Sequence, residues 1–254
     1  MEIKHFEEYD CVYDENNNLI EVYENQILTC RYKYNKHSKI TREDNLLLNT
    51  SIEYKYNEFN KLVQRSFYDY TLHNLKNVKY TDNFTYDSNN HITSYNDERF
   101  SYDKNGNTSI FRNAKLKISN SNLIKLDNFT FKYDVNNCRT TKYYRKTNTL
   151  IRHKIRFIYK DNSITGFKLN NECYFYKKNY NNDIVGIYNS NLNLICRYVY
   201  DCLGNHKYIT SDFNNETIAD INPFRFHSNY FDIELGLYFI NGRFYDSEID
   251  CYLN

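Results

Sequence analysis

The stretch CRYKYNKHSKI, residues 30–40, decides the fold. Cys30, Tyr32 and Tyr34 alternate with two basic residues, and a period of two is that of a β-strand with one ring-lined face and one polar face. Asn35 follows the last tyrosine, and short carbonyl side chains favour turns because they bond to backbone amides two residues further on. The stretch therefore predicts a strand that ends in a tight turn.

The same pattern recurs along the chain, which is the signature of a repeat architecture. A tyrosine is followed by Asp or Asn, by polar turn residues, and by an apolar residue about six positions after the tyrosine. Clear copies begin at Tyr13, Tyr34, Tyr56 and Tyr86, and looser copies begin at Tyr102, Tyr133, Tyr159, Tyr180 and Tyr200. Each copy predicts one β-hairpin.

A lone hairpin is marginal in water, so neighbouring hairpins must pair edge to edge. We therefore expect an all-β fold in which antiparallel hairpin repeats form a curled or spiralling sheet strip. The motif residues expected to shape this strip are Tyr13, Asp14, Tyr34, Tyr56, Tyr86, Asp87, Tyr102, Asp103, Tyr133, Asp134, Tyr200 and Asp201.

Composition limits the possible partners. The chain has 28 Tyr and 17 Phe but no Trp, so aromatic rings must supply much of the core. Its formal net charge of +1 provides no overall field for phosphate backbones or anionic lipids, and we expect no nucleic-acid partner. No apolar run approaches the roughly 18 residues that a membrane span needs. The N-terminus lacks the pattern of a secretory signal, so the chain as written is expected in the cytoplasm.

The sequence predicts neither a metal site nor a cofactor. Seven cysteines occur without CxxC spacing, and we expect buried free thiols. The seven histidines are scattered, without an HxxxH pair. No GxSxG, HExxH or GxxxxGK motif occurs, so we expect no enzyme.

The end of the chain differs from the repeats. NPFRFHSNYFDIELGLYFINGRFYD, residues 222–246, contains the one proline of the chain and a high density of aromatic residues. Together with the repeats and with NDIVGIYNSNLNLICRYVYDCLGNH, residues 182–206, it resembles the RHS or YD-repeat family and its repeat-associated core. The positions that match this closing motif are Asn222, Pro223, Phe224, Arg225, Tyr230, Asp232, Gly236, Leu237, Tyr238, Arg243, Tyr245 and Asp246.

The resemblance implies a partial RHS-type shell: a strip of hairpins at residues 1–212, whose last part, 172–212, begins the repeat-associated core, and a C-terminal plug at 213–254. In the family, such shells enclose the toxic C-terminal domain of bacterial polymorphic toxins and of insecticidal toxin complexes. We expect a non-catalytic shell fragment without that domain, because the chain stops where the cargo would begin. The family also implies secretion or a cell-surface location.

The chain departs from the closing motif in three places. Ser247 stands where the family has Pro, and Asp250 and Cys251 stand where it has Gly-Arg. In many members an aspartyl site just beyond this point cleaves the chain. Asp232, Asp246 and Arg243 could be remnants of a carboxylate site; the alternative is turn-stabilising aspartates and a buried, paired arginine.

Other partners and functions stay open. A toxin domain or an upstream repeat protein could be the partner, and open sheet edges could also pair with a second copy of the chain. A cell-surface carbohydrate-binding module is the alternative function, because exposed rings can stack on sugars, and glycans would then be the partners. A small enzyme, such as a toxin remnant, is the third.

Overall fold

The structure is a computed structural model, and it describes residues 2–6, 8–119, 122–126, 129–133, 139–144, 155–169, 171–210, 218–233 and 235–253. The chain divides into two compact units, Met1–Phe100 and Ser101–Asn254. No helix among the described residues is long and apolar enough to cross a membrane.

The first unit is one antiparallel sheet of ten strands, paired in the order in which they occur in the chain. Alternating burial along β6 follows the predicted period of two, because Ile52 and Tyr54 are buried whereas Lys55 is exposed. The strands are β1 (Glu2–Phe6), β2 (Tyr9–Tyr13), β3 (Leu19–Glu24), β4 (Ile27–Tyr34), β5 (Ile40–Asn45), β6 (Thr50–Tyr56), β7 (Leu62–Asp69), β8 (Tyr80–Tyr86), β9 (Ile92–Tyr95) and β10 (Glu98–Arg99).

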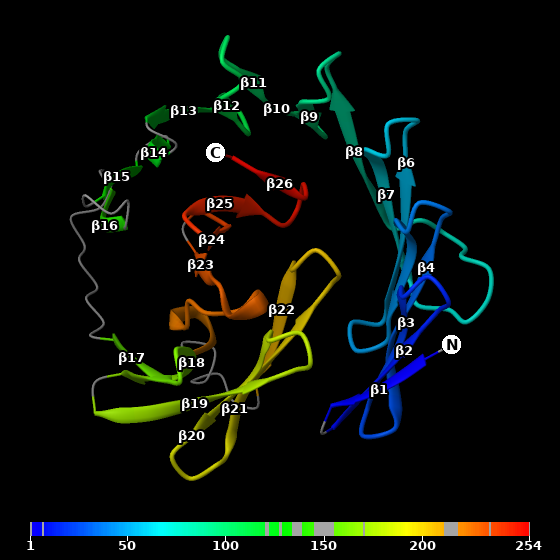
Figure 1. Cartoon of the computed structure of the whole chain (residues 1–254), viewed down its shortest axis with the longest axis vertical. Coiled ribbons are helices and arrows are strands. Elements are labelled where there is room, and N and C mark those ends of the chain that lie inside the picture. The colour runs from blue at the N-terminus through cyan, green and yellow to red at the C-terminus, as the bar shows by residue number, and fades with distance from the viewer. Residues whose placement is uncertain are drawn as a thin grey trace. The chain divides into compact units, whose positions relative to one another are not determined.

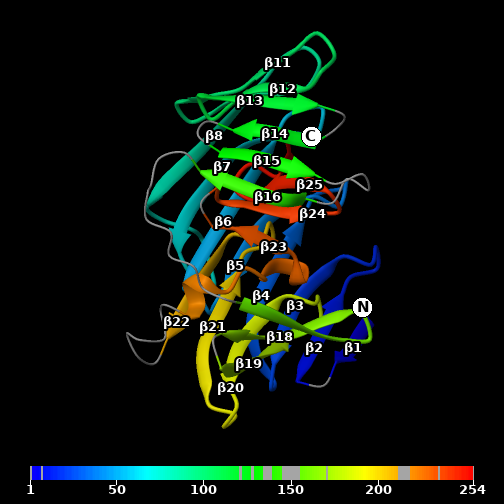
Figure 2. The same ribbon diagram turned by 90° about the vertical axis from the view of Figure 1, so that its left-hand side faces the viewer.

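The second unit begins with a six-stranded antiparallel sheet, again in chain order. Figure 2 shows its strands running side by side. They are β11 (Ser101–Tyr102), β12 (Thr108–Phe111), β13 (Ala114–Ser119), β14 (Asn122–Leu126), β15 (Phe129–Tyr133) and β16 (Arg139–Tyr144).

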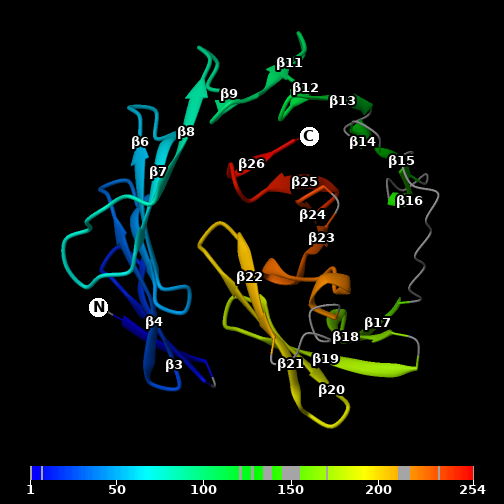
Figure 3. The same cartoon turned by 180° about the vertical axis from the view of Figure 1, so that it is seen from behind.

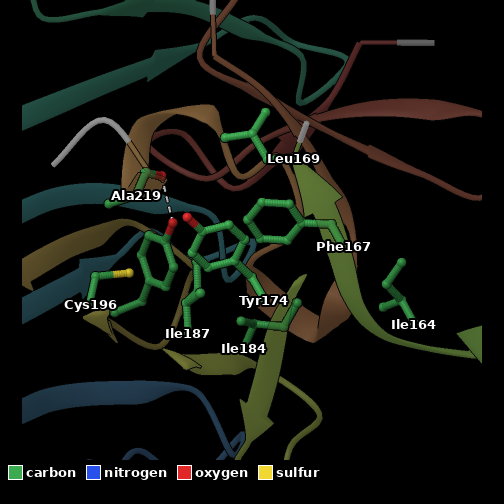
Figure 4. Close-up of a cluster of buried hydrophobic side chains, with 9 residues drawn as sticks. Ile164, Phe167, Leu169, Tyr174, Ile184, Ile187, Cys196 and Ala219 are labelled. Carbon is green, nitrogen blue, oxygen red and sulfur yellow. Dashed lines mark hydrogen bonds between the residues drawn. The ribbon is translucent and has the colours of Figure 1, made fainter. Parts of the chain in front are cut away.

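A second six-stranded sheet follows and carries a cluster of buried side chains. Its strands are β17 (Ile155–Lys160), β18 (Ser163–Leu169), β19 (Glu172–Lys178), β20 (Ile184–Asn189), β21 (Leu194–Tyr200) and β22 (His206–Thr210). Figure 4 shows the cluster: the rings of Phe167 and Tyr174 stack at 5.0 Å, and a hydrogen bond runs to the Ala219 carbonyl. Its donor is the Tyr198 hydroxyl, 2.6 Å away.

The closing segment forms a sheet of its own. It comprises the short 3-10 helix η1 (Phe226–Ser228) and four antiparallel strands, β23 (Tyr230–Asp232), β24 (Leu237–Ile240), β25 (Arg243–Asp246) and β26 (Cys251–Tyr252). In Figures 1 and 3 this sheet lies between β11–β16 and β17–β22, within the second unit. Ring contacts agree, because Phe244 packs on Phe131 of β15 at 5.5 Å and Phe226 packs on Tyr200 of β21 at 5.8 Å.

The predicted all-β class and the antiparallel hairpins are confirmed. The strands of the closing segment also pair consecutively, as the strands of hairpins do. Its short strands are interrupted by turns at Gly236 and Gly242, which both adopt positive φ. The division at residues 212 and 213 stays a prediction.

Candidate functional site

The Asp or Asn after most of the repeat tyrosines builds the turn. Asp14 Oδ1 accepts hydrogen bonds from the Asn16 and Asn18 amides at 2.9 and 2.8 Å, and Asn17 between them has φ 62°. Asp and Asn are interchangeable here, because only the Oδ1 acceptor is needed in every copy. The same pair of bonds is made by Asn35, Asn57, Asp87, Asp103, Asn179, Asn189 and Asp201. The copies expected at Tyr159 and Tyr180 do not fit, because Asp161 and Asn162 form the turn after Tyr159, and Asn179, which precedes Tyr180, forms the other turn.

The tyrosine itself joins one repeat to the one before. The Tyr34 hydroxyl donates to the Leu19 carbonyl at 2.7 Å, Tyr56 to Ile40 at 2.7 Å and Tyr86 to Leu62 at 2.8 Å. Leu19, Ile40 and Leu62 are the apolar residues six positions after Tyr13, Tyr34 and Tyr56. The apolar residue that ends one copy of the motif therefore provides the carbonyl to which the tyrosine of the next copy donates.

The second unit contains bonds of the same kind, and we call these bonds from tyrosine hydroxyls to carbonyls the tyrosine ladder. Tyr133 donates to the Leu123 carbonyl at 2.9 Å and Tyr200 to the Ile184 carbonyl at 2.7 Å. Tyr13 and Tyr102 are half-buried, and the Lys4 ammonium lies 4.4 Å from the centroid of the Tyr13 ring. Asp134 lies outside the described residues.

The closing segment enters through Asn222, which is fully buried. Its Oδ1 accepts from the Tyr176 hydroxyl at 2.6 Å, and its Nδ2 donates to the Phe224 carbonyl at 2.7 Å. The Pro223 carbonyl accepts from the Phe231 amide at 2.6 Å. These bonds tie the start of the segment to β19 and to its own first strand.

Arg225 lies at the centre of a buried cluster, and only 3% of its surface is exposed. Its guanidinium carbon lies 4.7 Å from the Phe231 ring centroid and 5.4 Å from that of Tyr198. Nη2 donates to the Ala219 carbonyl at 3.3 Å, and Nη1 donates to His206 Nε2. We call Arg225, His206, Tyr198, Phe231 and Tyr238 the Arg225 cluster.

His206 is held neutral in this cluster. Burial and, second, the Arg225 charge lower the pKa of His206 to about 3. Because Nε2 accepts from Arg225, Nδ1 carries the proton and faces the Tyr238 hydroxyl at 3.2 Å. That hydroxyl in turn donates to the Gly204 carbonyl at 2.9 Å. The chain of bonds from Arg225 to Gly204 therefore has one consistent assignment of protons.

The closing sheet docks on the last repeat turn, residues 201–205. Besides Tyr238, the Tyr245 hydroxyl donates to the Leu203 carbonyl at 3.2 Å, and Asn205 Nδ2 donates to the Ser247 carbonyl at 3.1 Å. Gly204 has φ 95°, and a Cβ at this position would lie 2.5 Å from the Phe226 ring. Only glycine fits this turn beneath the closing segment.

An ion pair ties the closing sheet to β11–β16. Arg112, in the turn after β12, donates through Nε to Asp246 Oδ2 at 2.9 Å and through Nη2 to Glu248 at 2.6 Å. Asp246 is 2% exposed, and burial raises its pKa despite the neighbouring guanidinium. A pocket of about 300 Å³ opens beside this pair, and His206 and Phe231 also line it.

The other matched residues of the closing motif have structural surroundings. The Asp232 carbonyl accepts from the Gly236 amide at 2.8 Å, which closes the turn between β23 and β24. Tyr230 is half-buried, 5.8 Å from the Phe224 ring. Arg243 is not the buried arginine of the alternative interpretation, because it is exposed and its guanidinium lies 4.4 Å from the centroid of the Tyr252 ring. Arg225 is the buried arginine of the closing motif.

Residues that sequence reasoning missed are His206, Arg112 and Asp183. Asp183 is buried and its Oδ1 accepts from the His227 amide at 2.7 Å, which holds η1 against the turn before β20. The partners named for them here are 19 to 136 residues away in the chain. The sequence carries no local signal of such pairs.

The described residues contain no group of three His, Cys, Asp or Glu side chains that could hold a metal ion. Six described cysteines are free thiols, and Cys138 lies outside the described residues. Burial raises the pKa of Cys11 to about 11 and the pKa values of Cys30 and Cys196 to about 12. These thiols are protonated at neutral pH.

Sequence comparison finds relatives but no matching family model. The chain is 27% identical over 254 residues to the tRNA3(Ser)-specific nuclease WapA of Bacillus spizizenii and, to the same extent, to the tRNA nuclease WapA of Bacillus subtilis. Each match covers 87% of this chain and 10% of the relative. The chain thus spans about a tenth of the length of these relatives.

Solved structures share the fold. The TcdB2-TccC3-Cdc42 crystal structure matches 97% of this chain with a TM-score of 0.66 at 13% identity, and TcdB2-TccC3 matches it with a TM-score of 0.63. The chain covers 16% of each of those chains. The hairpin sheets and the closing sheet therefore have the fold of a part of these toxin-complex proteins.

Proposed function

We propose that this chain is a non-catalytic wall segment of an RHS or YD-repeat enclosure, related to the shells of polymorphic toxins, and that it holds a polypeptide cargo. The ladder of tyrosine hydroxyls carries this proposal. Each repeat tyrosine of the ladder donates to the carbonyl of the preceding repeat, as Tyr34 does to Leu19 and Tyr56 to Ile40. Such bonds fix successive hairpins within each sheet, as the wall of an enclosure requires.

The closing sheet supports the same proposal. Tyr238 and Tyr245 donate to the carbonyls of the last repeat turn, and Arg112 pairs with Asp246. The sheet is therefore fastened to strands on two sides, as a terminal element of the wall would be. The similarity of this chain to the toxin-complex structures and to WapA also supports the proposal. Candidate partners are a toxin domain and an upstream repeat protein.

Two further features favour a structural role over the alternatives. The hydroxyls of the repeat tyrosines donate hydrogen bonds to backbone carbonyls. These tyrosines therefore stabilise the sheet, which favours a structural role over sugar binding. The nuclease activity in the name of WapA is assigned to a protein of which this chain matches a tenth. We propose that it does not reside in this stretch.

A protection experiment tests the enclosure. A trypsin-sensitive unfolded reporter is joined to the C-terminus of the chain, and its cleavage rate is compared with that of the free reporter. We expect at least tenfold slower cleavage in the fusion, and loss of the protection when Gly204→Ala displaces the closing sheet. Gly106→Ala is the matched control, since a Cβ there meets nothing within 4 Å. Equal cleavage of free and fused reporter would contradict the proposal.

A second assay tests the absence of catalysis. Purified chain is incubated with total tRNA and magnesium, and the tRNA is expected to stay full length. Cleavage that co-purifies with the chain and disappears on a single side-chain change would show an enzyme instead.

A further inference from the structure

The two faces of the β17–β22 sheet differ in charge. Side chains paired across neighbouring strands share a face, and the face with Phe167, Tyr174 and Tyr198 is covered by residues 218–221 and the closing segment. We call the opposite face the outer face. Its charged positions in the register are Arg156, Lys160, Lys168, Lys177, Arg197 and Lys207.

The register places no carboxylate on the outer face of the described strands β17–β22. Glu172 pairs with Leu169 on the covered face, where it accepts from the Tyr174 hydroxyl at 2.7 Å, and Asp161 lies in the turn after β17. Arg156, Lys160, Lys168 and Lys207 have no ion pair among the described residues. The net charge of +1 for the whole chain therefore gives no indication that six cations are concentrated on this face.

An apolar stripe crosses the outer face between the cations. Ile158 pairs with Gly166, Gly166 with Phe175, and Phe175 with Tyr188, which in turn pairs with Leu194. Phe175 is 40% exposed and Leu194 46% exposed. The stripe therefore presents aromatic and aliphatic surface to solvent.

One ring of the stripe, that of Tyr188, lies over a glycine of the neighbouring row, Gly186. A Cβ on Gly186 would lie 3.2 Å from Cε2 of Tyr188 and 3.4 Å from Cδ1 of Leu194. The ring of Tyr188 thus leans over the bare backbone instead of projecting from the sheet. A projecting apolar side chain would favour insertion into lipid, whereas a flat ring favours stacking.

Cations lie on both sides of the stripe. Arg156 pairs with Lys168 on one side, and Lys160 lies four residues beyond Arg156 on the other, a separation of about 13 Å along the strand. Lys177 and Arg197, each paired with Gly186, continue the second row. Rings between rows of cations are how proteins hold unpaired bases and the phosphates that join them.

We propose that the outer face of β17–β22 binds single-stranded nucleic acid, with Phe175 and Tyr188 stacking on bases and the two cationic rows contacting phosphates. Duplex is disfavoured, because its bases are already stacked on one another and cannot stack on the two rings. This property goes beyond the wall function and does not depend on it.

The test measures fluorescence anisotropy of the full chain with a labelled 20-nucleotide oligo(U) over a range of salt concentrations. Arg156→Gln/Lys160→Gln/Lys168→Gln, three cations of the two rows, should weaken binding at least tenfold at low salt. The same variant should reduce the slope of log affinity against log salt by about 2, since each lost phosphate contact removes about 0.7. Phe175→Ala should weaken binding at least fivefold. The matched controls are Lys33→Gln/Lys39→Gln/Lys61→Gln and Phe59→Ala, all exposed positions of the first unit.

Each contrary result overturns the proposal. Equal affinities of the two triple variants would show no role for this face. Equal binding of duplex and oligo(U), with no effect of Phe175→Ala, would show charge attraction without stacking. Phe175-dependent binding to phosphatidylglycerol vesicles without binding to oligo(U) would assign the face to a membrane surface instead.

Discussion

The Tyr34 hydroxyl donates to the main-chain carbonyl of Leu19 at 2.7 Å, and so fastens the end of one repeat to the strand that leaves the preceding turn. The acceptor is the sixth residue after Tyr13, the tyrosine of that preceding repeat. This relationship explains why the motif has a tyrosine at one end and a strand-forming residue at the other.

Tyr56→Phe tests one rung of the ladder. The change removes the hydroxyl that donates to the Ile40 carbonyl at 2.7 Å but keeps the ring. We expect the free energy of unfolding to fall by about 1 kcal/mol, the usual worth of such a bond, measured by urea denaturation. Tyr70→Phe is the control, because that hydroxyl has no hydrogen bond within the described residues. An equal loss of unfolding free energy in both variants would show that the bond from Tyr56 to the Ile40 carbonyl does not stabilise the fold.

Leu192→Gly should stabilise the chain. Leu192 has φ 61° in a turn where the equivalent residues of other repeats are mostly Asn or Gly, and it is 77% exposed. A left-handed conformation costs an ordinary residue about 1 kcal/mol, and glycine avoids that cost while losing little packing. Thermal unfolding should shift upward, and Leu192→Asn should give a smaller rise in the same direction. A lowered melting temperature for both Leu192 variants would show that the left-handed backbone at Leu192 is not strained.

Gly204→Ala and Gly106→Ala separate backbone strain from docking. Both glycines occupy the same turn position with φ 95° and 82°, but only at Gly204 would a Cβ meet a ring, that of Phe226 at 2.5 Å. Gly106→Ala should cost about 1 kcal/mol. Gly204→Ala should cost several kcal/mol, because the closing sheet must also shift. Urea denaturation measures both, and similar losses would show that the closing sheet does not rest on this turn.

His206 predicts a pH dependence. Its folded pKa is about 3, whereas an unfolded histidine has about 6.5. Below about pH 6.5 the unfolded chain therefore binds a proton that the folded chain does not, and the free energy of unfolding should be about 2 kcal/mol lower at pH 5 than at pH 7 from this group alone. The loss continues as pH falls toward the folded pKa.

The variant His206→Gln isolates this contribution. Burial raises the pKa values of Asp183 and Asp246, and such groups act in the opposite sense, because their stabilisation is lost as pH rises. The comparison is therefore the difference between wild type and His206→Gln at pH 7 and pH 5, with the exposed His37→Gln as control. A slope unchanged by His206→Gln would show that His206 is not buried as a neutral group.

The repeats could be predicted from sequence because their determinants are local. The alternation of Ile52 and Tyr54 with Lys55 gives the strand, and the carbonyl side chain after each tyrosine gives the turn. The hydrogen-bond partner of each tyrosine hydroxyl could not be predicted from the sequence. It depends on the register between neighbouring hairpins, which is set by the bulge beside each turn, as between Val12 and Tyr13.

The closing segment was harder to predict because its contacts are distant in sequence. Arg225 and Arg243 belong to the same motif, yet one is buried on Tyr198 and the other is exposed. The difference arises because Arg225 packs on Tyr198 of β21, and no local sequence pattern connects β21 with the closing motif. The cationic outer face of β17–β22 was equally hidden, because it appears only when the strand register is known.

Amide hydrogen exchange across residues 222–253 tests the central claim most directly, that the closing segment is a sheet docked by tyrosine hydroxyls on the last repeat turn. We predict that its β24 and β25 amides are protected as strongly as those of β21, and that Tyr238→Phe, which removes the bond to the Gly204 carbonyl, lowers protection in the closing sheet by about tenfold while leaving β4 and β6 unchanged. Rapid exchange of β24 and β25 in the wild-type chain, with β21 still protected, would contradict the account.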